Sequence, residues 1–329
     1  MFGPNAGFDG EVYRHGFRLP PGPNGSEHTV TPDERDAVHA EVLAERRHLV
    51  ALAFRMLGTV AEAEDAVQET YLRWYRLSEA ERDAITVPRA WLTRAASRVC
   101  LNMLSSARHR RERYVGPWLP EPIPAYSFPA PDTAAADPLE HVTLDESVST
   151  ALLVVLESMT PAERVAFILH DVFATPFEEI AEIVGRTPAA CRQLATSARR
   201  RVQQSRSRRA SRAEHDGIVR AFAAAVQTGD LAALITVLDP HVELRSDGGG
   251  VVTAARNPVH GADKVARFLL GGRSKYPRST IVEQATPDGL GFAIWDEGSL
   301  AGITTLDIKD GLVTDIRIVV NPAKLSLWT

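Results

Sequence analysis

The 329-residue chain has few cysteines and no long apolar run, and each lack excludes a class of protein. Its two cysteines, Cys100 and Cys191, give neither a disulfide framework nor the spacing of a metal site, so we expect both to be small core residues. No apolar run approaches the ~18 residues needed to cross a bilayer, and the first residues lack a basic segment followed by an apolar one. We therefore expect a protein that has no membrane partner and stays in the cytoplasm.

Lysine is also scarce, with four residues beside 33 arginines, and the charge is unevenly distributed. The formal net charge is −5, yet residues 88–116 carry seven basic side chains against one acidic, and residues 186–213 carry nine against none. Residues 117–185 carry twelve acidic side chains and one basic. Dense positive segments are typical of phosphate binding, which arginine suits through bidentate contacts, so the pattern predicts a nucleic-acid partner. The acidic segments could instead face a basic protein.

Composition and helix-start signals divide the chain into six segments. The first helix begins at Thr31 with the proline after it, and this start recurs at Thr160, Thr175 and Thr187. Seven prolines in residues 116–138 predict an extended connector that does not pack. Apolar residues at helical spacing predict three packed helices before the connector and further helices after it. The predicted segments are a flexible tail at 1–30, a helical domain at 31–115, a proline-rich linker at 116–140, a second helical domain at 141–203, a basic linker at 204–213 and a last domain at 214–329.

The pattern changes after residue 214. One amphipathic helix, at about 214–228, is followed by segments in which apolar residues alternate with period two. Two such segments flank Asp310-Gly311, a strong signal of a β-hairpin. We therefore expect a helix over a curved antiparallel sheet, which is an α+β domain.

Residues 176–202 have the spacing of a helix-turn-helix. A helix at 176–184, a three-residue turn and a helix at 188–202 follow one another, and one face of the second helix is apolar. The opposite face is free to enter a major groove, where Arg can read guanine and Gln adenine. The predicted DNA-binding residues are Thr187, Arg192, Gln193, Thr196, Arg199 and Arg200. A solvated basic helix in an ordinary bundle is the alternative.

The helix that begins at Pro88 offers a second basic surface, away from its apolar face. Trp91 on the apolar face, like Trp74 in the preceding helix, is expected in the core. Two separated basic elements would suit one stretch of DNA. The basic and polar residues of this helix that we predict to contact DNA are Arg89, Arg94, Arg98, Asn102, Arg108, Arg110 and Arg111.

Several motifs follow one another between about residue 42 and 205, at residues 64–74, 88–92, 156–161 and 179–181, with Arg164. In their order and separation they resemble the motifs of the extracytoplasmic-function (ECF) sigma factors of bacterial RNA polymerase. The resemblance implies two all-α domains, a three-helix region-2 bundle and a helix-turn-helix region-4 bundle. It implies that the helix at 88–113 opens the −10 element and the helix at 188–202 reads the −35 element. It also implies binding to the β′ clamp helices and β flap of core RNA polymerase, with the core-binding residues Glu64, Asp65, Gln68, Glu69 and Arg73.

A narrower resemblance covers the rest of the chain. Residues 118–122, 247–250 and 321–325 are similar to the marks of a sigma-factor group with a SnoaL-like carboxy-terminal domain, which is cone-shaped and regulates the sigma domains in place of a separate anti-sigma protein. The chain differs from the pattern at Ala323 and Asn102, where Asp is usual, and at Ser105, where Arg is usual. The implied interdomain regulatory residues are Trp118, Leu119, Pro120, Glu121, Pro122, Asp247, Gly248, Gly249, Gly250, Asn321, Pro322, Lys324 and Leu325.

Other functions remain open for the last domain. Related folds include cyclases and hydrolases whose pockets use Asp, His or Arg, and His241, Asp247 and Asp296 are available, although Asp247 precedes three glycines and suits a turn. We assign no catalytic residue, metal or cofactor, and keep a small-molecule ligand in this domain as a candidate partner. The alternatives to a promoter-specificity subunit are a transcriptional regulator that works without polymerase and a bifunctional protein that turns over a small molecule.

Overall fold

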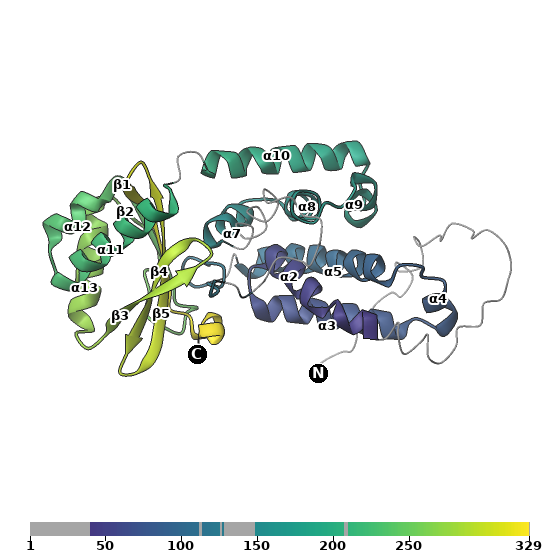
Figure 1. The fold of residues 1–329 in the computed structure, drawn as a ribbon, viewed down its shortest axis with the longest axis horizontal. Coiled ribbons are helices and arrows are strands. Elements are labelled where there is room, and N and C mark those ends of the chain that lie inside the picture. The colour runs from purple at the N-terminus through teal and green to yellow at the C-terminus, as the bar shows by residue number, and fades with distance from the viewer. Residues whose placement is uncertain (1–39, 112–113, 126, 128–148, 207–209, 329) are drawn as a thin grey trace, which may run out of the picture.

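The computed structural model describes residues 40–111, 114–125, 127, 149–206 and 210–328. We call residues 40–111 the first helical domain, 114–127 the connector, 149–206 the second helical domain and 210–328 the sheet domain. The two helical domains lie against each other at one end of the molecule and the sheet domain lies at the other (Figure 1). The predicted tail at 1–30, the helix start at Thr31 and linker residues 128–140 lie outside the described residues.

The first helical domain is built from three long helices, as its apolar spacing predicts. The Thr59 side chain caps the second of them by accepting a hydrogen bond from the Glu62 N–H at 3.3 Å, and Gly58, at φ +84°, ends the helix before it. A short helix that begins with a Ser78–Glu81 capping box was not predicted. The helices are α2 (Arg46–Leu57), α3 (Val60–Arg76), the short α4 (Glu79–Asp83) and α5 (Pro88–Arg111).

The second helical domain contains the predicted helix-turn-helix. Thr160 forms a capping box with Glu163, as the sequence predicts. The prediction of a cap at Thr175 was wrong, because the next helix begins after Pro176 and has no side-chain cap. The elements are α7 (Thr150–Glu157), α8 (Pro161–Phe167), the π-helix η1 (Ile168–Val172), α9 (Phe177–Val184) and α10 (Pro188–Arg206).

The apolar cores of the two helical domains are continuous, whereas the sequence suggested separate bundles. Leu57 and Leu92 of the first domain belong to the same buried cluster as Leu156 and Ile168 of the second. Arg164, which is 3 % exposed, donates from Nη1 to the Met56 carbonyl across the boundary at 2.9 Å. The apolar helix faces of the two domains can be buried against each other, but helical periodicity alone does not show which faces pack together.

The sheet domain has a six-stranded sheet in the order β2-β1-β6-β5-β4-β3. The predicted hairpin joins β5 to β6 through Asp310 and Gly311, both at positive φ. The sheet is not wholly antiparallel, because β1 pairs with β6 in parallel after a long excursion of the chain. The helices are α11 (Arg212–Thr228), α12 (Leu231–Val237) and α13 (Ala262–Lys275), and the strands are β1 (Leu238–Asp247), β2 (Val259–His260), β3 (Thr280–Thr286), β4 (Gly289–Asp296), β5 (Ser299–Lys309) and β6 (Leu312–Val319). Two 3-10 turns, η2 (Pro322–Lys324) and η3 (Ser326–Trp328), follow.

The sheet is covered on both faces. Helices α11, α12 and α13 pack on one face through residues such as Phe222 and Phe292. On the other face Ala293, Ile303 and Val319 form a small core, which also contains Leu119 of the connector. The connector is extended, but the prediction that it does not pack was wrong, because residues 119–123 are buried. Its prolines suit this path, since they leave few N–H groups that need partners.

Candidate nucleic-acid interfaces and the interdomain site

The second helix of the helix-turn-helix, α10, presents a polar face to solvent. Its Thr187 hydroxyl accepts from the Ala190 N–H at 3.2 Å, and Gly185, at φ +70°, ends α9 just before the turn. Cys191 and Ala198 are buried against α8 and α9, as the periodicity predicts. A shallow hollow on the opposite face is lined by Arg192, Gln193, Thr196, Ser197 and Arg200.

Two of the predicted DNA-contacting arginines of α10 are already engaged within the domain. Arg192 bonds the Glu178 carboxylate at 3.2 Å, and its guanidinium lies over the Phe177 ring at 5.4 Å. Arg199 is paired with Asp171. Both arginine side chains remain more than a third exposed, so such pairs are weak and can be exchanged for phosphate contacts.

Two of the predicted −10 arginines on α5, Arg94 and Arg98, face the second helical domain. Arg94 lies 3.4 Å from the Glu179 carboxylate and 3.5 Å from that of Glu182, and both acids belong to α9. Arg98 donates to the Glu182 carbonyl at 3.0 Å. Helices α8 and α9 pack on both α5 and α10, so the basic faces of α5 and α10 do not form one surface in this arrangement (Figure 1).

The other predicted −10 residues are placed differently. Arg89 pairs with Glu45 inside the first helical domain at 3.4 Å, and Asn102 is exposed. Ser105, which stands where the family has Arg, bonds the Leu101 carbonyl of its own helix at 2.9 Å. The side chains of Arg108, Arg110 and Arg111 lie outside the described part of the chain.

The predicted core-polymerase residues share the exposed side of α3 and ion-pair locally. Glu64 bonds Arg46 at 3.0 Å and Glu69 bonds Arg73 at 2.9 Å, while Asp65 and Gln68 are exposed. The sequence analysis missed two large apolar side chains beside them, which are 45 % and 44 % exposed and so extend this acidic surface with apolar area. These are Leu72 and Tyr75.

The interdomain residues converge on one carboxylate, that of Asp247 at the end of β1. Asp247 is fully buried and accepts four hydrogen bonds. Two come from the connector, from the Tyr114 hydroxyl at 2.6 Å and the Leu119 N–H at 2.9 Å. The others come from the Lys324 ammonium at 2.7 Å and the Gly249 N–H at 3.0 Å.

Lys324 joins the same carboxylate to the connector. Its ammonium, in a side chain that is 7 % exposed, donates to the Leu119 carbonyl at 2.5 Å and lies 4.1 Å from the centre of the Trp118 ring. Trp118 also contacts the first helical domain. A Cβ added at Gly58 would lie 3.0 Å from the Trp118 ring, so the ring packs directly on this glycine. We call Asp247, Lys324, Tyr114, Trp118 and Leu119 the Asp247 cluster.

Asn321 and the glycines complete the cluster. The Asn321 amide donates to the Tyr114 hydroxyl at 2.9 Å, and burial together with the Asp247 carboxylate raises the pKa of that hydroxyl. Gly249 is at φ +64°, and a Cβ added at this position would lie only 2.6 Å from the Asn321 side chain. A larger residue would therefore displace the loop. Ala323, which stands where the family has Asp, is exposed and its N–H bonds the Asn321 side chain.

Further contacts tie the connector to both of its neighbours. Glu121 is 2 % exposed and accepts from the Val60 N–H at the start of α3 at 2.8 Å. Burial raises the pKa of its carboxyl. The Pro122 carbonyl accepts from the Trp328 indole at 2.8 Å, and Trp328 gave no sequence signal. Pro120, like Leu119, is buried. A Cβ added at Gly250 would lie 3.2 Å from Val115 of the connector, and Leu325 packs in the small core that contains Leu119. Gly248 and Pro322 belong to the same two loops as Gly250 and Leu325.

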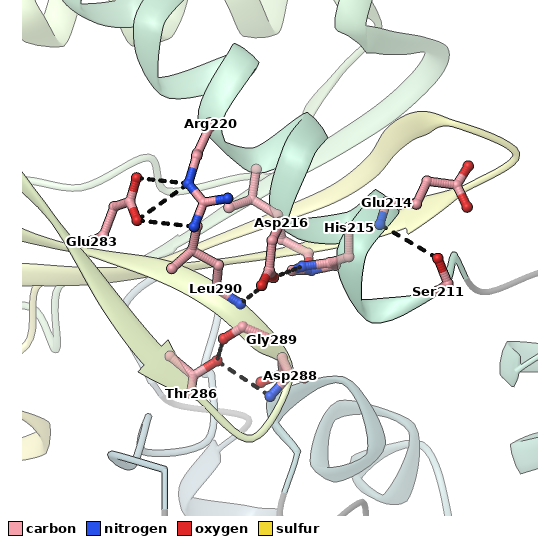
Figure 2. Close-up of polar contacts among 11 residues, drawn as sticks. Ser211, Glu214, His215, Asp216, Arg220, Glu283, Thr286, Asp288, Gly289 and Leu290 are labelled. Atoms are coloured by element: carbon pink, nitrogen blue, oxygen red, sulfur yellow. Dashed lines mark hydrogen bonds and ion pairs between the residues drawn. The ribbon is translucent and has the colours of Figure 1, made fainter.

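The sheet domain also caps a helix of the second helical domain. The two carboxylate oxygens of Asp288 accept from the Thr150 and Ala151 N–H groups at the start of α7, both at 2.9 Å. Figure 2 shows the β3–β4 turn that carries Asp288, in which the Thr286 hydroxyl accepts from the Asp288 N–H and donates to the Gly289 carbonyl. Sequence reasoning missed Asp288, since a turn aspartate carries no sign of the helix it caps.

Candidate catalytic residues do not share one site. Asp296 lines a cavity between the sheet and α13, whereas His241 is exposed and Asp247 belongs to the cluster described above. Cys100 and Cys191 are buried core residues, and burial raises the pKa of Cys100 to about 12. Within the described ranges, no group of three His, Cys, Asp or Glu side chains could hold a metal, and no helix is long and apolar enough to cross a membrane.

Comparison with known proteins agrees with this architecture. Residues 42–110 match the Sigma-70 region 2 family and residues 149–202 match the Sigma-70, region 4 family. The ECF RNA polymerase sigma factor SigJ of Mycobacterium tuberculosis (strain ATCC 25618 / H37Rv) is 39% identical over 299 residues, which are 87% of this chain and 93% of SigJ. The probable ECF RNA polymerase sigma factor SigI of the same strain is 38% identical over 294 residues, which are 89% of this chain and 96% of SigI.

A solved structure shows the same likeness in three dimensions. The crystal structure of the SigJ protein of M. tuberculosis superposes with a TM-score of 0.65 at 37% identity and covers 88% of this chain and 98% of that one. The sheet domain is included in this overlap, which confirms the predicted α+β architecture. The chain therefore belongs to the ECF RNA polymerase sigma factors, as a member with a SnoaL-like domain after its two helical sigma domains.

Proposed function

We propose that this sigma factor binds core RNA polymerase through α3 and promoter DNA through α5 and α10. We also propose that its sheet domain controls the separation of the two helical domains, which promoter opening requires. The acidic and apolar side of α3 suits the basic β′ clamp helices, and the second helical domain suits the β flap and the −35 duplex. Because this function requires RNA polymerase and promoter DNA, we expect the protein to act in the cytoplasm. The core-binding contacts would come from Glu64, Asp65, Gln68, Glu69 and Arg73.

The −35 surface is accessible in the arrangement that the structure shows, which we call the closed state. In the open state the two helical domains are separated and the connector has left its buried path. The polar face of α10 is open to solvent, and its hollow contains Arg192, Gln193 and Arg200, which match the donors and acceptors of base edges. Arg192 would exchange Glu178 for DNA, since an exposed ion pair contributes ~0–1 kcal/mol.

The observation that carries regulation is the pairing of α5 with α9. Helix α9 packs on α5 and bonds Arg94 and Arg98 through Glu179 and Glu182, so we infer that it keeps −10 DNA away from these two arginines. Promoter opening therefore requires the two helical domains to separate, and the connector must leave its buried path for that to happen.

The sheet domain opposes this separation. It bonds the connector through the Asp247 cluster and α7 of the second helical domain through Asp288. These contacts keep the connector and the second helical domain in their closed positions. A domain tethered to its target has an effective concentration of order mM, so these contacts form without a separate protein. Moving such an equilibrium from 1:99 to 99:1 needs only ~5.5 kcal/mol of differential binding.

Run-off transcription with purified core enzyme tests the proposal. The full chain should give core-dependent transcripts, and a chain that ends before residue 210 should bind promoter DNA more tightly, because α5 is easier to release. Asp288→Asn, which keeps every strand of the sheet, is the milder companion variant and should change activity in the same direction. A chain that neither co-purifies with core polymerase nor starts transcription would contradict the sigma role. Equal promoter affinity in all three proteins would contradict the regulatory role.

A further inference from the structure

The sheet domain contains a cavity of about 420 Å³ between α11, α13 and the helix-covered face of the sheet. Its walls are mainly apolar and include Phe222, Ile281, Phe292 and Ile294. Cavities that bind small organic molecules have ~300–1,000 Å³ and such apolar walls with a few polar groups. The size and lining therefore fit a small molecule and not a macromolecule.

A few polar side chains also line the cavity, among them Thr304, Asp296 and Arg273. The Thr304 residue is 5 % exposed and lines the cavity, and Asp296 lines it from the end of β4. Within the described part of the chain, the Thr304 hydroxyl and the Asp296 carboxylate form no hydrogen bond or ion pair. The Thr304 hydroxyl and the Asp296 carboxylate would accept from a ligand N–H or O–H, so the ligand carries a hydrogen-bond donor.

The mouth of the cavity is also apolar. Phe268, Tyr276 and Val252 line it and are each more than a third exposed. Large apolar side chains gathered at the rim of a cavity are typical of a binding site, because each costs hydration free energy when left in water.

The cavity shares its wall with the Asp247 cluster. Leu325 lines the cavity and belongs to the small core that contains Leu119 of the connector. Pro322 and Leu325 flank Lys324, which bonds Asp247. Val252 lies in the loop that follows Asp247. A molecule in the cavity therefore touches the segments that hold the connector.

We propose that this cavity binds a small, largely apolar molecule with one hydrogen-bond donor, and that the bound molecule stabilises the closed state, in which the sheet domain holds the connector. The inference rests on the proposed regulatory role of the sheet domain. The wall formed by Pro322 and Leu325 is complete when the cluster is closed, so the ligand gains these contacts in the closed state and loses them in the open one. A ligand shifts an equilibrium toward the state that it binds more tightly.

The site is tested with N-phenyl-1-naphthylamine, a neutral apolar fluorophore with one N–H donor, titrated into the full chain. Saturable binding is expected, and Ile281→Trp should weaken it by about tenfold or more, because the indole occupies cavity volume. Val282→Trp is the matched control, since Val282 is the next residue of β3, points to the opposite side and is 44 % exposed. Equal affinity in wild type and Ile281→Trp, or no saturable binding, would overturn the site.

The coupling is tested by hydrogen exchange of residues 117–125 in the full chain, with and without the fluorophore. Saturation should slow exchange of the Leu119 and Glu121 amides by about fivefold or more, the lower end of ordinary coupling between sites. Ile281→Trp should abolish this effect and Val282→Trp should keep it. Binding that leaves connector exchange unchanged would refute the coupling, whereas loss of core-dependent transcription in the ligand-free chain would instead refute the proposed function.

Discussion

Replacing Lys324 with Met is expected to open the connector. The substitution keeps the length and apolar stem of the side chain and removes its ammonium. Asp247 then loses its cation, and the Leu119 carbonyl loses its donor. In the closed state the carboxylate is fully buried, so water cannot replace the lost partner without opening the cluster.

The size of the effect follows from this burial. Removing one partner of a buried ion pair costs about 3–5 kcal/mol, because the other charge is left uncompensated. In the open state both groups are in water, so the substitution costs little there. Since every 1.4 kcal/mol is a factor of ten, the open fraction should rise by about 10²- to 4 × 10³-fold.

Hydrogen exchange of the connector measures this change directly. The Leu119 amide bonds Asp247 and the Glu121 amide bonds the Gly58 carbonyl, so both are protected only in the closed state. Lys324→Met should accelerate their exchange by the factor above and tighten promoter binding. Lys264→Met, the same substitution at an exposed position of α13, is the control and should change neither. Unchanged protection in Lys324→Met would refute the reasoning that the buried pair holds the connector.

Three further predictions concern single side chains. Arg192→Ala should relax −35 sequence preference by ~1–3 kcal/mol in competition between promoter sequences, and an equal loss on all sequences would make Arg192 a phosphate contact. Burial and the nearby Arg89 and Arg55 lower the pKa of His48 from 6.5 to about 4, so its contribution is present above pH 6.5 and is lost as pH falls toward 4. Urea unfolding should therefore show a loss of about 2 kcal/mol between pH 7.5 and 5 that His48→Gln removes, and the same loss in both proteins would exclude His48 as its origin. The pKa of Glu121 is raised by burial, so the folded chain holds this proton more tightly and gains stability as pH falls through the raised pKa toward 4.5. Glu121→Gln should flatten this part of the melting-temperature profile, and a profile parallel to that of the wild type would contradict the assignment.

Much of the secondary structure was readable from the sequence because its causes are local. Thr160 and Thr187 cap helices through N–H groups three residues away, and Asp310-Gly311 supplies the positive φ angles of a hairpin. The polar and buried faces of α10 follow from helical spacing alone. The cap expected at Thr175 failed because the chain enters α9 in an extended conformation at Pro176.

The candidate site was only partly readable. The motifs at 118–122, 247–250 and 321–325 identified segments that meet, but their roles rested on resemblance. Tyr114, Asp288 and Trp328 were missed, since a single Tyr, a turn Asp and a terminal Trp have no local pattern that marks an interdomain contact.

By itself the sequence determined the local elements, the two basic blocks and the resemblance to a family, because these depend on neighbouring residues and on composition. Only the tertiary structure decided that Lys324 pairs with Asp247, 77 residues away, and that Arg94 faces Glu179, 85 residues away. The chain offers 42 acidic side chains, and periodicity ranks none of them as a partner. That choice is made by packing, which brings together the apolar faces of separate domains and leaves a buried charge stable only where its partner is already in place.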